Sequence, residues 1–238
     1  MSRENSGLPH QFGDGERDRR ALLADLAARA ETEAEEASRL RRSSLEALGS
    51  ELERAARAIA QRLSAGACVY SFGDGESSID ATCAAALFSR SRGASLPARS
   101  LVADRAVITS AGDDADHELG FSRQLAACAR AGDIAIGYSI GPEADNVVDA
   151  FEEAGKRGLL TVGFTGCAGG QMATRGVLDH CFAVPSRDLH RIQEAVMALS
   201  YDLWARVEQL PTPDGDRQAL SQQQTAAEQG LLVTEEAR

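Results

Sequence analysis

Apolar side chains recur along this chain with two different periods. From Arg17 to about Leu63 they fall every three or four positions, first within Leu22–Ala30 and again within Leu45–Leu63, as in amphipathic helices. The polar stretch Arg41–Ser44 lies between these runs and is a candidate break between two helices. Beyond residue 64, short apolar runs alternate with helical stretches. We therefore expect N-terminal helices followed by a domain of mixed strands and helices.

The second part of the chain predicts a parallel sheet. Strand-like runs occur at 67–72, 106–109, 133–139, 159–164 and 180–184, the second of them weakly. Helical runs separate or follow them at 77–90, 114–130, 143–157, 170–175 and 189–209. This alternation predicts an α/β fold with a doubly wound five-stranded parallel sheet flanked by helices and preceded by an N-terminal helical extension.

The chain divides into four expected segments. Residues 1–15 are polar and expected to be disordered, 16–64 form the N-terminal helices, 65–210 form the α/β domain, and 211–238 form a flexible tail. The N-terminal helices carry narrow apolar stripes, so we expect them to pair with another copy in a homo-oligomer, either a dimer or a tetramer. Packing against the chain's own core is the alternative.

Three loops are candidates for a binding site, because parallel sheets bind ligands at the carboxyl ends of their strands. They follow Phe72, Ser139 and Thr165. The first, Ser71–Ser78, is a glycine-rich turn that opens a helix, and free N–H groups at a helix start favour an anion. Asp74 and Glu76 lie in the same turn, and their carboxylates oppose a phosphate.

Composition narrows the classes of partner. The chain has 238 residues, a net charge of −11, no apolar run of about 20 residues and no apolar leader, so we expect a cytoplasmic protein that binds neither nucleic acid nor membranes. Its 5 cysteines form no C-x-x-C pair, which argues against a zinc ribbon or a disulfide framework. Cys167, in a glycine-rich loop, is the candidate for a reactive thiol, although an unreactive loop residue is the simpler interpretation.

An ordered series of motifs resembles the SIS (sugar isomerase) domain, in particular phosphoheptose isomerases and their replication-initiator-binding relatives. The resemblance runs from about Leu45 to Leu210. It rests on matches to five motifs: G-N-G-x-S-x-x-D-A at 73–81, G-D-x-x-x-G at 132–137, T-G-x-x-G-G-x-M-A at 165–173, V-P-S at 184–186 and R-I-Q-E at 191–194. Between the first two motifs, the residues that match the family are Asp104, Thr109, Asp114, Phe121, Arg123 and Gln124. It implies an SIS fold that binds a sugar phosphate or another carbohydrate derivative.

Two departures from the family bear on function. Where the resemblance implies a phosphate loop S-T-S-G-N-S, this chain reads Ser139-Ile140-Gly141-Pro142-Glu143-Ala144, so three hydrogen-bonding side chains are missing and a carboxylate is added. The resemblance assigns a His, a Glu, a Gln and a second His to metal binding and proton transfer. The matching positions here are Cys83, Leu87, Gln193 and Tyr201, so only the Gln is retained. We therefore expect no bound metal and no cofactor, and we assign no catalytic residue.

The resemblance and the loops together define the candidate site. The ligand-binding candidates are Gly73, Asp74, Gly75, Glu76, Ser77, Ser78, Asp104, Ser139, Gly141, Glu143, Thr165 and Gln193, with His190, Cys83 and Tyr201 as secondary candidates. Three hypotheses stay open. In the first, the chain is a catalytically degenerate protein with a binding or regulatory role toward a carbohydrate or a protein partner. In the second, it is an active aldose–ketose isomerase that uses other residues. In the third, it is an inactive subunit that pairs with an intact SIS paralogue.

Overall fold

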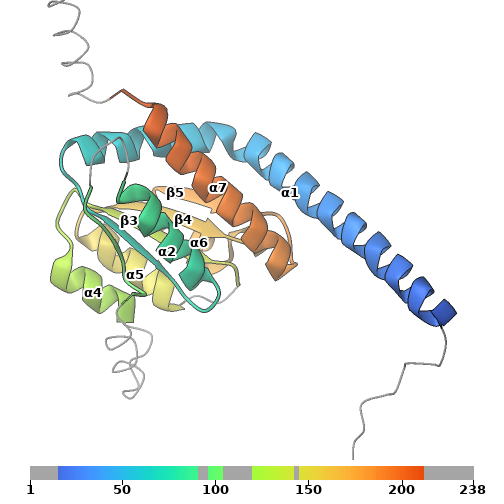
Figure 1. Ribbon diagram of the computed structural model, residues 1–238. Coiled ribbons are helices and arrows are strands. Elements are labelled where there is room, and N and C mark those ends of the chain that lie inside the picture. The colour runs from blue at the N-terminus through green and yellow to red at the C-terminus, as the bar shows by residue number, and fades with distance from the viewer. Residues whose placement is uncertain (1–15, 91–95, 104–119, 142–144, 212–238) are drawn as a thin grey trace, which may run out of the picture. The chain divides into compact units, whose positions relative to one another are not determined.

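The computed structural model describes residues 16–90, 96–103, 120–141 and 145–211 of the chain. Its centre is a five-stranded, all-parallel sheet in the order β2-β1-β3-β4-β5 (Figure 1). The strands are β1 (Val69–Gly73), β2 (Ala98–Ser100), β3 (Ile134–Ser139), β4 (Leu160–Thr165) and β5 (His180–Ala183). The helices are α1 (Glu16–Ser64), α2 (Ser77–Phe88), α4 (Gly120–Cys128), α5 (Asp145–Lys156), α6 (Gly170–Thr174) and α7 (Leu189–Gln209), with a short 3-10 turn, η3, at Cys167–Gly169. The expected α/β fold is confirmed.

Residue alternation along β1 shows why both faces of the sheet are covered. Tyr70 and Phe72 point into a core that includes Phe121 of α4 and Phe151 of α5. Ser71 points to the opposite face, where its hydroxyl donates to the carbonyl of Ala81 in α2 at 2.6 Å. Successive side chains of a strand point to opposite faces of the sheet. Because all five residues of β1 are buried, helices cover both faces of the sheet here.

The face covered by α2 and α7 is held together by aromatic stacking and one buried hydrogen bond. The rings of Tyr138, Phe164 and Phe182 stack across β3, β4 and β5 with centroid separations of 5.0 and 4.9 Å. The hydroxyl of Tyr138 lies 2.8 Å from that of Ser200 in α7. Because a buried phenol needs a polar partner, this contact fixes α7 against the middle of the sheet.

The first half of α1, up to Leu40, forms a compact unit of its own, separate from residues 41–211. Its side chains Leu22, Leu23 and Leu26 are exposed. In the second unit, the remainder of α1 contacts the sheet and α7. Nδ1 of His180 lies 2.5 Å from Oε1 of Glu51, and Nη1 of Arg206 lies 3.4 Å from Oε2 of Glu53.

Several sequence predictions need correction. The helix continues through Arg41–Ser44, so the expected break is absent. The second strand of the sheet is Ala98–Ser100, a short edge strand that the hydropathy pattern did not indicate. The weak run at 106–109 lies outside the described residues, as do the terminal segments 1–15 and 212–238. None of the described helices is long and apolar enough to span a membrane.

Candidate functional site

The three loops expected to form a site all leave the carboxyl edge of the sheet. The first begins at Gly73, where β1 ends. A Cβ on Gly73 would lie 2.6 Å from the carbonyl oxygen of Ser77 and 3.0 Å from that of Tyr138, so no side chain fits there. Gly75 has a φ of +53°, in the left-handed region that favours glycine. These two glycines let the chain reverse at the end of β1 and start α2 directly above the sheet.

The start of α2 differs from the expected open anion cradle. The N–H groups of Ser77, Ser78 and Ile79 donate to the carbonyls of Asp74, Gly75 and Glu76, at 3.0, 3.2 and 3.2 Å. The N–H of Gly75 donates to the Asp74 carboxylate at 2.7 Å. The turn therefore satisfies most of its own donors.

Two polar side chains lie buried beneath this turn. The Ser77 hydroxyl and both carboxyl oxygens of Asp80 are inaccessible to solvent and have no hydrogen-bond partner among the described residues. They are three residues apart and so lie on one face of α2, the face toward the sheet. Burial raises the pKa of Asp80 to about 7. In the sequence, Asp80 stands out only as part of the motif at 73–81, because its burial depends on the sheet below it.

A deeply buried phenol neighbours this carboxyl group. Burial raises the pKa of Tyr138, and the charges of Asp80 and Cys83 contribute in the same direction. The side chains of Asp80, Cys83 and Tyr138 thus form one neighbourhood between α2 and β3.

The loop after β3 uses its remaining serine internally. The Ser139 hydroxyl is buried and donates to the carbonyl of Gly141 at 3.4 Å. Ile140 is buried as well, and its side chain has no hydrogen-bonding group. Glu143 lies outside the described residues, as does Asp104 after β2.

The loop after β4 is tied to the loop that precedes α7. Thr165 is buried, and its hydroxyl donates to the carbonyl of Gly166 at 3.3 Å. Cys167, half-buried, has a φ of +49°, which is uncommon for a residue with a side chain. Its N–H donates to the carbonyl of Ser186 at 3.1 Å. This loop therefore holds a strained turn at the same edge as the turn at Gly73.

Helix α7 brings one expected residue to the first loop. Nε2 of Gln193 donates to the carbonyl of Glu76 at 3.4 Å, so two candidates that are far apart in sequence lie side by side. His190 is exposed one turn earlier, and its N–H donates to the Asp188 carboxylate at 3.0 Å. The structure thus joins the start of α7 to the start of α2.

The remaining candidates lie farther along the two helices. Cys83 and Leu87 lie four residues apart on α2, and both are half-buried. Tyr201 on α7 is 51% exposed and meets Trp204 edge-on, with ring centroids 6.3 Å apart. Within the described part of the chain, no group of three or more His, Cys, Asp or Glu side chains is placed to hold a metal ion.

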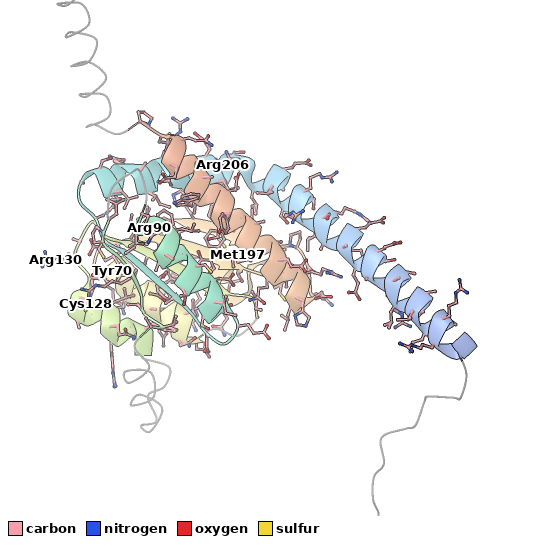
Figure 2. The ribbon with its side chains drawn as sticks, viewed as in Figure 1. Tyr70, Arg90, Cys128, Arg130, Met197 and Arg206 are labelled. Atoms are coloured by element: carbon pink, nitrogen blue, oxygen red, sulfur yellow. The ribbon has the colours of Figure 1, made fainter. Side chains whose placement is uncertain are left out.

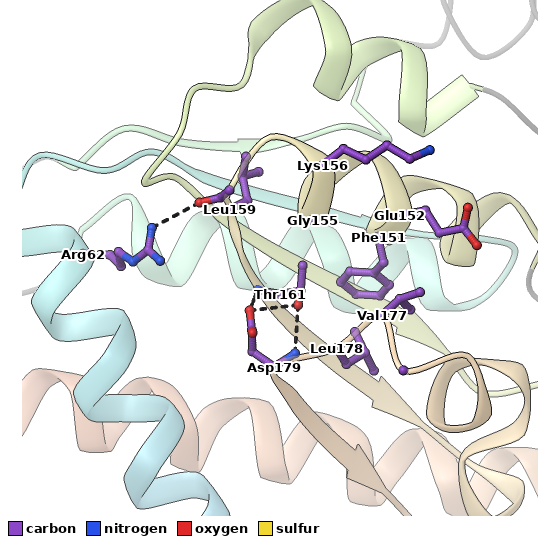
Figure 3. Close-up of a pocket in the computed structure, with 12 residues that line it drawn as sticks. Arg62, Phe151, Glu152, Gly155, Lys156, Leu159, Thr161, Val177, Leu178 and Asp179 are labelled. Atoms are coloured by element: carbon purple, nitrogen blue, oxygen red, sulfur yellow. Dashed lines mark hydrogen bonds between the residues drawn. The ribbon is translucent and has the colours of Figure 1, made fainter.

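A cavity of about 630 Å³ opens at the opposite, amino edge of the sheet (Figure 3). Its polar groups are largely paired with one another. Thr161 and Asp179 exchange hydrogen bonds of 2.8 to 3.0 Å, and Nη1 of Arg62 donates to the carbonyl of Gly158 at 3.3 Å (Figure 3). Glu152 forms an ion pair with Arg175 at 3.4 Å. The cavity therefore offers a ligand few open polar groups.

Comparison with known proteins agrees with this geometry. The sequence pattern of the SIS domain family matches residues 34–166, which is more than half of the chain. The chain belongs to the SIS domain family. Its SIS sequence is 38% identical to the phosphoheptose isomerase of Thermodesulfovibrio yellowstonii over 163 residues, 67% of this chain and 80% of that protein. It is 41% identical to the phosphoheptose isomerase of Burkholderia pseudomallei over 113 residues, 48% of this chain and 56% of that protein.

A solved SIS structure extends the agreement to three dimensions. The phosphoheptose isomerase of Neisseria gonorrhoeae superposes with a TM-score of 0.72 at 27% identity, covering 78% of this chain and 100% of that protein. The resemblance seen in the sequence is confirmed, and the chain is an SIS protein of the phosphoheptose isomerase-like type.

Proposed function

We propose that this SIS protein binds a sugar phosphate or a related carbohydrate derivative at the carboxyl edge of its sheet, without the metal-dependent isomerisation that the resemblance implies. The observation that carries the proposal is a contrast within α2 and α7. The glycine turn at Gly73–Ser77 is retained, whereas two of the four positions assigned to metal binding and proton transfer hold Leu87 and Tyr201.

The chemistry of these replacements argues against isomerisation. A leucine neither ligates a metal nor accepts a proton, and a phenol is a poor general base at neutral pH. Loss of one acid–base group typically lowers the rate by about 10²–10⁴-fold. Cys83 and Gln193 alone are too few for a closed zinc site.

Several features support retained binding. The Ser77 and Asp80 side chains have buried polar atoms with no hydrogen-bond partner among the described residues, and Gln193 lies against the same turn. Relatives that match most of their own length are phosphoheptose isomerases, and their name indicates a phosphorylated sugar as the ligand class.

Charge is expected to limit the affinity for phosphate. The Asp74 carboxylate already accepts the N–H of Gly75, which a phosphate would otherwise use. At about 6 Å and an effective dielectric near 20, one carboxylate opposes each phosphate charge by roughly 3 kcal/mol before screening. A less phosphorylated or neutral sugar derivative is therefore favoured over a highly charged one.

Three measurements on the full chain test this proposal. Calorimetric titration with sedoheptulose 7-phosphate should give measurable binding, a coupled assay should give no turnover near the usual range of about 1–10³ s⁻¹, and metal analysis after purification without chelator should give no stoichiometric zinc. A triple variant, Cys83→His, Leu87→Glu and Tyr201→His, should gain zinc. Stoichiometric zinc in the parent that disappears in Cys83→Ala would contradict the proposal.

A second candidate is an active isomerase that uses other residues. The observation that favours it is Asp80, whose pKa of about 7 suits proton exchange at neutral pH. Turnover that is abolished in Asp80→Asn but kept in Leu87→Ala would support this alternative. An inactive subunit paired with an SIS paralogue is the third hypothesis, tested by co-purification with such a partner.

The assembly is part of the proposal. Leu22, Leu23 and Leu26 are 44%, 56% and 51% exposed on the first half of α1, which suits pairing with the same helix of another copy. Light scattering of the parent and of a Leu22→Ser, Leu26→Ser variant would report the oligomeric state. A parent that is monomeric throughout would exclude the homo-oligomer.

A further inference from the structure

The first half of α1 is a helix with an uncovered apolar face. Every residue from 19 to 36 is exposed, including Leu22, Leu23 and Leu26. Figure 2 shows side chains projecting from this part of the helix along its whole length. A single helix of about this length is marginally stable in water, and most helices gain their stability by packing an apolar face against a neighbour. This half of α1 is therefore stabilised by any partner that covers its leucines.

The apolar residues of this helix form one stripe, and the stripe is uneven in size. They recur at spacings of three and four, as Leu22, Leu23, Leu26, Ala27, Ala30, Ala34 and Ala37. The leucines lie at the N-terminal end of the stripe, and only alanines follow Leu26 within it. Two parallel copies would bring leucine against leucine at one end and alanine against alanine at the other. Two antiparallel copies centred on Leu26 bring Leu22 against the partner's Ala30, so a large side chain meets a small one, as close packing requires.

Charge is distributed unevenly along the same helix. Arg19 and Arg20 precede the leucines, whereas residues 31–36 hold four glutamates and no basic residue. Between these two ends, Nε of Arg29 pairs with the Asp25 carboxylate at 2.9 Å within the chain. A parallel, in-register pair of copies would align the basic ends with each other and the acidic segments with each other. An antiparallel pair places each basic end beside the acidic segment of the other copy, which is the electrostatically complementary arrangement.

The spacing of one arginine and one glutamate fits a two-fold axis at Leu26. Arg20 and Glu31 are eleven residues apart, which is about three helical turns, so they lie on the same flank of the stripe. Their midpoint along the helix lies next to Leu26. In an antiparallel pair the same flanks of the two helices face each other. A two-fold axis near Leu26 therefore sets Arg20 of each copy beside the partner's Glu31, in two contacts that are equivalent by symmetry.

We propose that two copies of this chain pair through the first half of α1 as antiparallel helices, with the two-fold axis at Leu26 and with Arg20 of each copy beside the partner's Glu31. This inference rests on the homo-oligomer proposed above and adds the surface, the orientation and the register of the contact. Residues 19–33 lie outside the part of the chain that the SIS family pattern matches, so membership of the family does not by itself supply this contact.

Cysteine crosslinking of the full chain tests the orientation. In a Cys128→Ser background, which removes an exposed native thiol, Leu26→Cys should form a disulfide-linked dimer with itself on mild oxidation. Leu22→Cys should link to Ala30→Cys when the two variants are mixed, but not to itself, because the two copies of residue 22 would lie about 12 Å apart along the helix axis. The background protein without an added cysteine is the control. Self-linking of Leu22→Cys at the yield of Leu26→Cys would indicate parallel helices and overturn the proposal.

A charge swap tests the register. Arg20→Glu should weaken dimerisation by about threefold to tenfold at low salt, and adding Glu31→Arg should restore it, as measured by analytical ultracentrifugation. Arg39→Glu makes the same charge change two residues after Ala37, on the opposite side of the helix from the stripe, and should have little effect. A double variant that stays as weak as Arg20→Glu would show that these two side chains do not meet, and the proposed register would be wrong.

The outcomes separate this inference from the proposals on which it rests. A parent that is monomeric at every concentration would exclude both the homo-oligomer and this contact. A dimer that crosslinks in the parallel pattern would exclude only this contact. Sedoheptulose 7-phosphate binding, measured separately by calorimetry, scores the proposed ligand site in either case.

Discussion

The two helices that meet at the carboxyl edge begin in different ways. The N-cap residue of α7 is Asp188, whose carboxylate accepts the N–H groups of His190 and Arg191 at 3.0 and 3.2 Å. The N-cap residue of α2 is Glu76, whose side chain makes no capping hydrogen bond. The first N–H groups of α2 turn back onto the carbonyls of the glycine turn instead. The first N–H groups of α7 are therefore satisfied by a side chain, and those of α2 by backbone carbonyls.

This difference bears on where the proposed ligand site would lie. An N-cap carboxylate both satisfies the donors of α7 and places a negative charge where an anion would lie, so that start is used for stability. In α2 the capping side chain is absent, and the buried polar atoms of Ser77 and Asp80 lie directly below. A buried unpartnered carboxyl group lowers stability, which is common where a site is built for a ligand.

The largest expected effect comes from removing the buried carboxyl group of α2. Asp80 has a folded pKa of about 7 against an ordinary value of 3.8, so its cost to stability is absent below about pH 3.8 and grows as pH rises to about 7. Asp80→Asn should therefore stabilise the protein by about 2–3 kcal/mol more at pH 8 than at pH 5, measured by urea unfolding.

A matched control uses Asp133, the other buried aspartate among the described residues. The Asp133 carboxylate accepts the N–H groups of Cys68 and Arg130, both at 2.8 Å, so Asp133→Asn should destabilise the protein. If Asp80→Asn behaves like Asp133→Asn and shows no pH dependence, then Asp80 is satisfied in solution and the contrast between the two helix starts is weaker than described.

A second test removes negative charge from the loops that follow β1 and β3. Glu76→Gly with Glu143→Asn should strengthen sugar-phosphate binding by about tenfold to a hundredfold, because two carboxylates no longer oppose the anion. Calorimetric titration of the double variant against the parent measures this. Glu194→Gln on α7 is a control that removes one carboxylate outside these two loops. Unchanged affinity in a folded double variant would mean that these carboxylates do not face the ligand.

The closed start of α7 gives a smaller and purely structural effect. Asp188→Ala should cost about 1 kcal/mol of stability because two N–H groups lose their acceptor, whereas Asp188→Asn should retain most of it. Chemical denaturation of both variants gives the comparison. Equal losses in the two would show that the charge of the carboxylate, and not its capping bonds, stabilises α7.

The smallest effect concerns the contact between the two starts. Gln193→Ala removes a single long hydrogen bond to the carbonyl of Glu76, so it should cost about 0.5 kcal/mol or less. Its effect on sugar-phosphate affinity should exceed its effect on stability if Gln193 faces the ligand. A loss of stability without any change in affinity would assign Gln193 to structure alone.

The sequence predicted most of the fold because its regular elements are locally encoded. Four of the five strands were expected within one or two residues, since β-branched and apolar runs between glycine turns identify them. The edge strand Ala98–Ser100 was missed because it is short and lacks such a run. The break expected at Arg41–Ser44 was wrong, because arginine and serine in a helix with exposed faces do not end it.

Sequence alone also determined the family and the residues that differ from it. The motif series, Leu87 and Tyr201 are all read directly from the chain. Only the tertiary structure decided how these residues are used. It paired the N–H groups of the glycine turn with backbone carbonyls, buried Asp80 with no partner among the described residues, and placed Gln193 against Glu76. The physical reason is that hydrogen-bond satisfaction and burial depend on neighbours from distant segments, which local sequence does not specify.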